Sequence, residues 1–239
     1  MVPGTSHPAV IDPGNSLVAL ACPTVRRCTA VDDVNQEVTF DPTAPGRPKP
    51  VEIDLRQTNL TAIACPSASQ CTAIDRAGRE VTFDPVASGT PVPAPTTIDA
   101  SGKGGAIACP STSQCTATEF GGAVVTFDPT APGTPTLARL DASADVDIAC
   151  AVVSRCTAVD DVGREFTFDP AVPGSPTLIS VDLVADEQEA VACPSVSACT
   201  TVDDSGREVT FDPGSPTTPT TATIDTAPSL LGTQDHAFE

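Results

Sequence analysis

The chain has 239 residues, enough for one large all-β domain, and its net charge of −19 comes from 31 acidic and 12 basic residues. This charge excludes nucleic acid and anionic lipid surfaces as main partners, because both need clustered Lys and Arg, and it favours cations or basic proteins. No apolar run approaches the roughly 20 residues of a membrane span, so we expect no membrane insertion. No signal peptide is visible after Met1.

One pattern recurs five times along the chain, and the second copy shows it most clearly. That copy has a small apolar run at 61–65, a run from Cys71 to Asp75, an alternating run at 79–83 and a last run ending at Asp99. Short β-branched runs that end in Gly, Pro or Asp are typical of strands. We name the four predicted strands a, b, c and d in chain order.

The links between these runs predict how the strands pair. The b–c link carries residues that accept the positive φ of a tight hairpin: Asn35, Gly78, Gly122, Gly163 and Gly206. The c–d link begins with Phe-Asp-Pro and is rich in Pro and Gly, which favours a turn. Links this short require antiparallel pairing and argue against a β-helix, the alternative for repeats. Four strands in about 43 residues match one propeller blade.

The sequence therefore predicts an all-β fold, a five-bladed β-propeller with four antiparallel strands and one disulfide per blade. A single domain covers 1–239, with blades at 17–54, 60–99, 104–141, 146–182 and 189–225.

The two ends do not fit a simple count of five blades. Residues 1–14 are expected to be an extra closing strand, because Pro8–Asp12 resembles strand d. Residues 226–239 are a C-terminal tail in which Ser229–Gly232 resembles the start of strand a. One d strand is therefore surplus. A surplus edge strand invites pairing with another chain, which suggests oligomer formation or contact with a host protein.

Ten cysteines form five Cys-x5-Cys pairs, each around an a–b turn. The pairs are Cys22/Cys28, Cys65/Cys71, Cys109/Cys115, Cys150/Cys156 and Cys193/Cys199. Residues that face each other across a hairpin lie near disulfide distance. Zinc is the alternative, but its sites usually use closer cysteine pairs with His, and His7 and His236 lie at the chain ends. We expect disulfides that link strands a and b across the hairpin, and hence an extracellular or cell-surface location.

The string Ile-Ala-Cys-Pro-Ser-x-Ser-x-Cys-Thr-Ala-Val-Asp, followed by Gly and Asp-Pro, resembles the Cys-paired β-propeller repeat modules of secreted actinobacterial proteins. The resemblance covers residues 17–225 and implies fold and export, but no reaction. The Asp-x-Gly turn is also loosely similar to the Asp-box of sialidase-type propellers. It departs from that pattern because its aromatic residue lies five positions after Gly206, so no Asp-box chemistry is carried over.

No catalytic residues are predicted. The blades contain no His for a Ser/His/Asp set, and no phosphate-binding glycine motif occurs. We expect a non-catalytic binding or scaffold module that holds a protein or a small ligand on a propeller face or at the channel mouth. The alternative is a carbohydrate-active propeller, either a lectin or a glycosidase with paired carboxylates. The absence of Trp and Tyr weakens that alternative, since sugar sites usually offer an aromatic face.

An acidic residue recurs at the end of each predicted strand b: Asp32, Asp75, Glu119, Asp160 and Asp203. In the structural interpretation these carboxylates accept hydrogen bonds from the b–c turn. In the functional interpretation they form a ring that binds Ca²⁺ or another hard cation. No other metal or cofactor is expected. The Phe-Asp-Pro aspartates are interpreted as turn residues.

Overall fold

The computed structural model describes residues 9–54, 58–87, 94–99, 104–140, 146–181 and 188–224. These residues form five sheets, and each sheet holds four antiparallel strands in chain order. The prediction of an all-β chain with five such sheets is confirmed. Of the predicted closing strand at 1–14, residues 9–14 form bends and a turn outside any strand, and residues 1–8 lie outside the described part, as do 226–239.

The strands are numbered along the chain, four to a sheet. Sheet 1 contains β1 (Leu17–Thr24), β2 (Arg27–Asp32), β3 (Gln36–Phe40) and β4 (Val51–Glu52). Sheet 2 contains β5 (Leu60–Ser67), β6 (Gln70–Asp75), β7 (Arg79–Phe83) and β8 (Thr96–Thr97). Sheet 3 contains β9 (Gly104–Ser111), β10 (Gln114–Glu119), β11 (Ala123–Phe127) and β12 (Thr136–Arg139). Sheet 4 contains β13 (Val146–Val152), β14 (Arg155–Asp160), β15 (Arg164–Phe168) and β16 (Ile179–Ser180). Sheet 5 contains β17 (Gln188–Ser195), β18 (Ala198–Asp203), β19 (Arg207–Phe211) and β20 (Thr220–Thr223).

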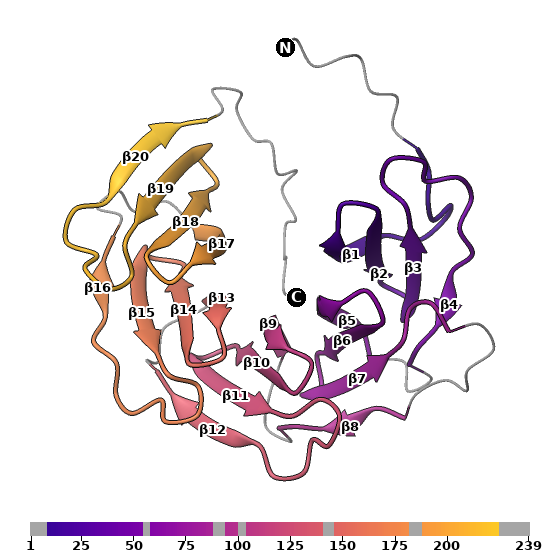
Figure 1. The fold of residues 1–239 in the computed structure, drawn as a ribbon, viewed down its shortest axis with the longest axis horizontal. Helices are drawn as coiled ribbons and strands as arrows, with labels where there is room; N and C mark the ends of the chain where they lie inside the picture. Colours follow the sequence, from indigo (N-terminus) through magenta and orange to yellow (C-terminus); the bar gives the residue numbers. More distant parts are fainter. Residues whose placement is uncertain are drawn as a thin grey trace, which may run out of the picture.

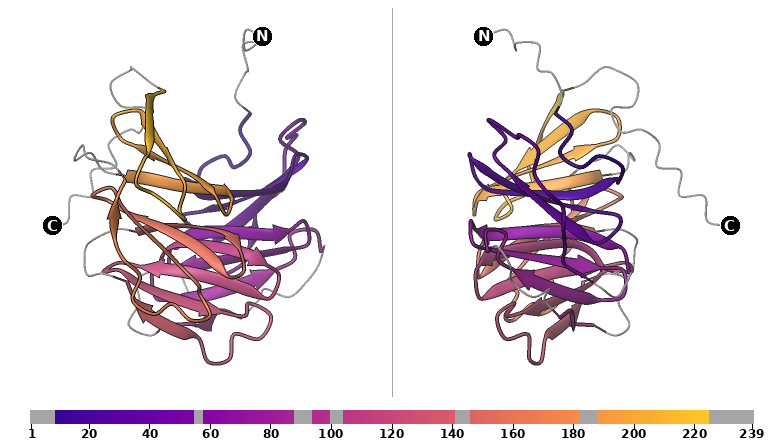
Figure 2. Two further views of the ribbon diagram at one scale, coloured as in Figure 1. Left: turned by 60° about the vertical axis from the view of Figure 1, so that its left-hand side comes forward. Right: turned by 90° about the vertical axis from the view of Figure 1, so that its right-hand side faces the viewer.

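The sheets are arranged like blades around a common centre (Figure 1). The a strands β1, β5, β9, β13 and β17 are innermost, and each of the first four lies beside the a strand of the next sheet. Sheets 1 and 5 stand apart in the same view, so the described sheets form an open arc. The side views show the sheets following one another in chain order (Figure 2).

Each b–c hairpin turns at a residue with positive φ, as predicted. Asn35 has φ of 69°, and the glycines at the same place in the other sheets have φ between 68° and 76°. Only Gly, and more rarely Asn, adopts this conformation at low cost, which explains the residue types found there.

Consecutive sheets pack through four apolar junctions. Each sheet has a trailing face, which meets the next sheet, and a leading face, which meets the preceding one. In the first junction Val31 and Ile53 of the trailing face pack with Leu60, Ile63 and Phe83 of the next leading face. The other three cores use most of the same positions, but Gly104 and Gln188 stand in the place of Leu60, and Thr118 stands in the place of Val31. Burying large apolar side chains is worth roughly 1.5–3 kcal/mol each, so these junctions hold the sheets together.

Polar contacts at the a–b turns reinforce the first three junctions. The residue before the second cysteine reaches a backbone carbonyl oxygen in the next sheet in each case. Arg27 donates to Ala68 at 3.1 Å, Gln70 to Thr112 at 2.8 Å, and Gln114 to Val153 at 2.6 Å.

Candidate functional site

The five acidic residues at the ends of the b strands are all buried. Four of them accept a hydrogen bond from the backbone of the b–c turn. The nitrogen of Gln36 lies 2.7 Å from Asp32, that of Arg79 3.0 Å from Asp75, that of Arg164 2.8 Å from Asp160 and that of Arg207 2.9 Å from Asp203. These are the contacts that the structural interpretation predicts.

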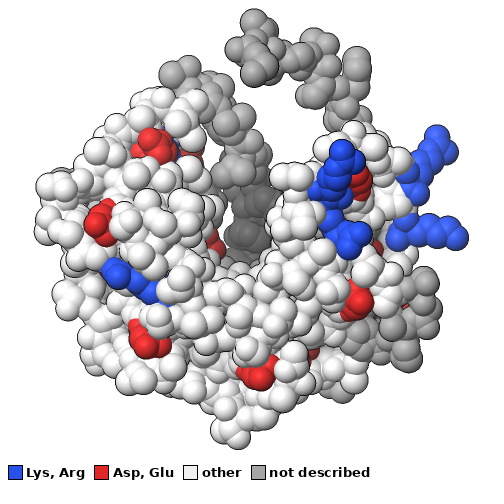
Figure 3. Space-filling view, in the orientation of Figure 1, with Lys and Arg blue, Asp and Glu red and all other residues white. Residues whose placement is uncertain are grey.

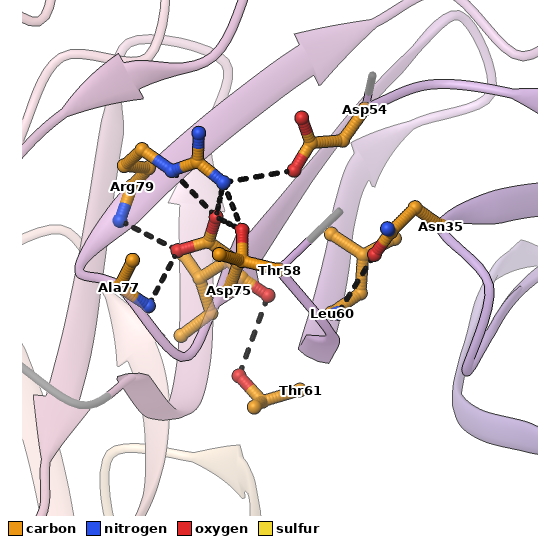
Figure 4. A network of polar contacts seen from close by, with 9 residues as sticks. Asn35, Asp54, Thr58, Leu60, Thr61, Asp75, Ala77 and Arg79 are labelled. Carbon is orange, nitrogen blue, oxygen red and sulfur yellow. Dashed lines mark hydrogen bonds and ion pairs between the residues drawn. The ribbon is translucent and has the colours of Figure 1, made fainter. Parts of the chain in front are cut away.

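Three of the acidic residues also pair with an arginine four residues later. Figure 4 shows the most extensive case, where the Arg79 Nε donates to Asp75 at 2.7 Å and its Nη2 donates to Asp54 of sheet 1 at 3.1 Å. Thr58 lies in the same network and donates to Asp75 at 2.6 Å. Asp160 pairs with Arg164, and Asp203 with Arg207, both at 2.6 Å. In these three sheets a guanidinium occupies the place next to the carboxylate.

The two remaining positions lack this arginine, because Gln36 and Ala123 stand there instead. Asn15 donates to Asp32 at 3.2 Å and to Asp12 at 3.4 Å. Burial raises the pKa of Asp32. Burial and the neighbouring Asp99 carboxyl raise the pKa of Glu119 to about 7. The five positions of the predicted ring are therefore three ion pairs and two pairs of carboxyl groups, Asp32 with Asp12 and Glu119 with Asp99. The binding of a cation at Asp32 or Glu119 stays a prediction.

A second set of buried carboxylates lies on the c strands and was not predicted from the sequence. Thr82 donates to Glu80 at 2.8 Å and exchanges a hydrogen bond with Thr72 of the b strand at 2.9 Å. The same Thr–Thr–Glu chain recurs in sheets 1, 4 and 5, while Val124 replaces the glutamate in sheet 3. Burial raises the pKa of Glu80 and of Glu165 to about 7. The sequence feature that could have indicated these glutamates is the recurring string Glu-x-Thr-Phe on the c strands.

The Phe-Asp-Pro aspartates act as turn residues, as interpreted from the sequence. Each side chain accepts the backbone N–H two residues later, at 2.8 or 2.9 Å, in Asp41, Asp84, Asp128, Asp169 and Asp212. Hydrogen bonds from the side chain and backbone of Thr43 and of Thr130 lower the pKa of Asp41 and of Asp128.

The five predicted disulfides are present, and each joins strands a and b of one sheet. The Cα–Cα distances are 4.0 or 4.1 Å in the pairs Cys22–Cys28, Cys65–Cys71, Cys109–Cys115, Cys150–Cys156 and Cys193–Cys199. All ten cysteines are thereby bonded. In sheet 4 the two cysteines are direct partners across the hairpin, as predicted. The register shifts near the a–b turn in every sheet, just after the cysteine pair in sheet 4 and across it in the other four, which the sequence did not predict.

The structure adds a second role for the second cysteine of each pair, which the sequence did not predict. These residues are core residues with at most 3% of their surface exposed: Cys28, Cys71, Cys115, Cys156 and Cys199. The last four pack in the apolar junctions between sheets, and Cys28 is buried outside those junctions. The physical reason is the pleat of strand b, which turns alternate side chains toward the preceding sheet. Such buried sulfur atoms are structural and offer no accessible site.

Both histidines lie outside the described residues. Within the described ranges, no three His, Cys, Asp or Glu side chains come together as a metal site. The described part also contains no helix long and apolar enough to cross a membrane.

Comparison with known proteins finds a similar fold among solved structures but identifies no family. No protein-family model matches the chain, and no curated protein matches it. Among solved structures the chain is similar to one titled "Structure of U3-55K", with a TM-score of 0.69 and 11% identity. The match covers 82% of this chain and 62% of that one, so this chain spans about three fifths of that structure. At this identity the likeness concerns the fold alone.

Proposed function

We propose that this protein is a non-catalytic extracellular binding scaffold whose five sheets are the blades of a β-propeller. The observation that carries the proposal is how its carboxylates are used. The recurring acidic residues are buried and engaged in contacts that hold turns, strands and neighbouring sheets. Such groups serve stability in most copies, whereas propeller enzymes depend on residues that differ between blades.

The outer face of the a–b turns and c–d links is the best candidate binding surface. These connections lie at one edge of the sheets because strands a and c run in the same direction. They expose large apolar residues on four sheets: Val25, Val86, Val153, Val172 and Val196. In Figure 3 acidic side chains appear as separate spots, basic side chains gather over sheet 1, and most of the remaining surface is uncharged. Interface cores are depleted in charge, so this face suits a protein partner.

The extracellular location rests on the disulfides. A cytosol kept reducing by thiols would not preserve five of them, whereas an oxidising compartment would. The resemblance to repeat modules of secreted proteins supports the same location.

Affinity capture from cell-wall and cell-surface extracts tests the binding role. We expect a retained protein whose capture is lost with Val25→Asp/Val153→Asp/Val196→Asp. It should persist with Val10→Asp, an exposed position outside the sheets. Capture of nothing, or equal capture by both variants, would contradict the proposal. A glycan array and a hydrolase substrate panel run in parallel, and a hit there would favour the carbohydrate-active alternative.

A further inference from the structure

The trailing face of sheet 5 is uncovered in the described structure. Ile224 is 63% exposed, whereas the matching residues of the other sheets are all buried: Ile53, Ile98, Leu140 and Val181. Val202 of β18 is only half-buried, while its counterparts Val31, Ile74, Thr118 and Val159 are buried. Glu208 is likewise only half-buried, unlike Glu37, Glu80 and Glu165. This sheet therefore presents an apolar face that every other sheet buries.

In the second and third junctions the first residue of the following a strand lies against this face. A Cβ at Gly104, which begins β9, would lie 3.3 Å from the Ile74 side chain of sheet 2. In the next junction the Thr118 hydroxyl donates to the carbonyl oxygen of Val146, which begins β13, at 2.7 Å. In both junctions the residue in the place of Val202 thus contacts the start of the next a strand.

The spacing along the chain identifies such a start after sheet 5. Six or seven residues separate the buried d residue from the next a strand, as in Ile53 to Leu60 and Ile98 to Gly104. Counting six and seven residues from Ile224 leads to Leu230 and Leu231. Both belong to residues 225–239, which lie outside the described structure. In the chain these residues come directly after Ile224 of the uncovered face.

The N-terminal side of sheet 1 offers a precedent. Ile11 precedes Leu17 by six residues, so Asp12 corresponds to Asp54 at the end of strand d. Asn15 bridges Asp12 and Asp32, which places Asp12 beside the b-strand acid, as Asp54 lies beside the Arg79–Asp75 pair. A terminal segment without a sheet of its own therefore occupies the place of a missing neighbour.

Sheet 5 differs from sheets 1, 2 and 3 at the residue before the second cysteine. Ala198 stands where Arg27, Gln70 and Gln114 reach the a–b turn of a following sheet. Its methyl group cannot make that contact. A complete sheet at this face, whether sheet 1 or a second copy, would bring an a–b turn. Ala198 offers that turn no hydrogen-bond donor from its side chain.

We propose that the C-terminal segment Ser229–Gly232 lies as an a strand on the trailing face of sheet 5, with Leu230 and Leu231 covering Val202 and Ile224. Its attachment to β20 through a short link gives it a high effective concentration at this face. The segment then fills the space between the last and first sheets.

A single tryptophan tests this placement, because the chain has no Trp and no Tyr. Ile224→Trp puts the probe on the face, and Val172→Trp, also strongly exposed, is the matched control. We expect Trp emission at shorter wavelength and several-fold weaker acrylamide quenching for Ile224→Trp than for the control. Adding Leu230→Asp/Leu231→Asp to Ile224→Trp should remove the differences from the control in emission wavelength and in quenching. Adding Ala237→Asp should leave both differences unchanged. The melting temperature of each variant in the Val172→Trp background checks that the sheets remain folded.

Two results would overturn the proposal. Equal exposure of both probes means that nothing covers the face. A protected probe that ignores Leu230→Asp/Leu231→Asp means that another occupant covers it. Protection lost on dilution then identifies a second copy, and protection lost with Leu17→Asp/Leu20→Asp identifies sheet 1. Neither result bears on the partner-binding test of the turn face.

Discussion

At the scale of single residues, Arg79 is the best-connected side chain at the buried acidic positions. It lies between Asp54 and Asp75, and all three side chains are buried. Replacing it by Ala removes the cation that lies between these two carboxylates. Breaking a buried ion pair from one side costs about 3–5 kcal/mol, so we expect Arg79→Ala to lower the free energy of unfolding by that amount.

Urea unfolding at constant pH measures this change. Arg26→Ala is the control, because its ion pair with Asp41 is exposed and 3.9 Å long, and exposed pairs contribute about 0–1 kcal/mol. Similar losses for both variants would show that Arg79 is not the cation that holds Asp54 and Asp75.

The buried glutamates make stability depend on pH. Burial raises the pKa of Glu80 and of Glu165 to about 7. Between pH of about 4.5 and 7 the folded protein keeps protons that the unfolded chain has lost, so stability falls as pH rises through this range. Each group accounts for about 2–3 kcal/mol of this fall.

Glu80→Gln and Glu165→Gln imitate the protonated form and should remove part of the fall. We expect each variant to match the parent protein near pH 4.5 and to exceed its stability at pH 8, measured by urea titrations at both pH values. Glu208→Gln, at the same repeat position but half-buried, is the control and should change the pH profile less. A parent protein that gains stability above pH 5 would contradict the assigned pKa direction.

At the scale of elements, the a, b and c strands could be predicted because local chemistry defines them. Positive-φ turns at Asn35 and Gly78 fix the b–c hairpins, and the cysteines align strands a and b. The d strands are shorter than a regular repeat suggests: β4, β8 and β16 contain two residues each. Pro50 and Pro95, just before β4 and β8, cannot donate to a ladder, which shortens an edge strand.

The acidic positions show the limit of such prediction. The sequence marks Asp75 as a repeated residue and places Arg79 four residues later, but not Asp54 of the neighbouring sheet beside them. That contact depends on how sheets pack on one another. The burial of Glu80 and of Cys71 has the same origin, since neighbouring sheets cover them.

The disulfides stabilise each sheet by closing a short loop and, in four sheets, by filling a junction core. Closing a loop with a cysteine separation of six is worth about 2 kcal/mol in the chain-entropy model. We expect Cys22→Ala/Cys28→Ala to lower the free energy of unfolding by at least this much, measured by urea unfolding without reductant. Cys65→Ala/Cys71→Ala and Cys109→Ala/Cys115→Ala should cost more than this and about as much as each other, because Cys71 and Cys115 also pack between sheets. A variant of undiminished stability would show that the bridge does not constrain the unfolded chain.

At the scale of the whole molecule, the repeat predicts how each sheet meets the next but not how the series ends. Five similar repeats predict four similar junctions between consecutive sheets. The periodicity of the sequence does not indicate whether sheets 5 and 1 form a fifth junction. The departures that matter are single residues: Ala198 in place of Arg27, Gln70 or Gln114, and Ile224 exposed where Ile53 is buried. Only the assembled structure shows that these departures fall at one edge of the arc.

The five strand-c phenylalanines therefore differ in what they stabilise. Phe127 is 4% exposed within the junction of sheets 2 and 3, whereas Phe40 of sheet 1 faces away from sheet 2 and is only half-buried. A buried Phe→Ala change costs about 3–5 kcal/mol, because it removes apolar contacts and leaves a cavity. We expect this loss for Phe127→Ala and about half of it for Phe40→Ala, measured by urea unfolding. Phe83→Ala and Phe168→Ala should behave like Phe127→Ala. If Phe40→Ala costs as much as these three, sheet 1 is packed against a fifth junction in solution, and the arc is closed there by direct contact between sheets.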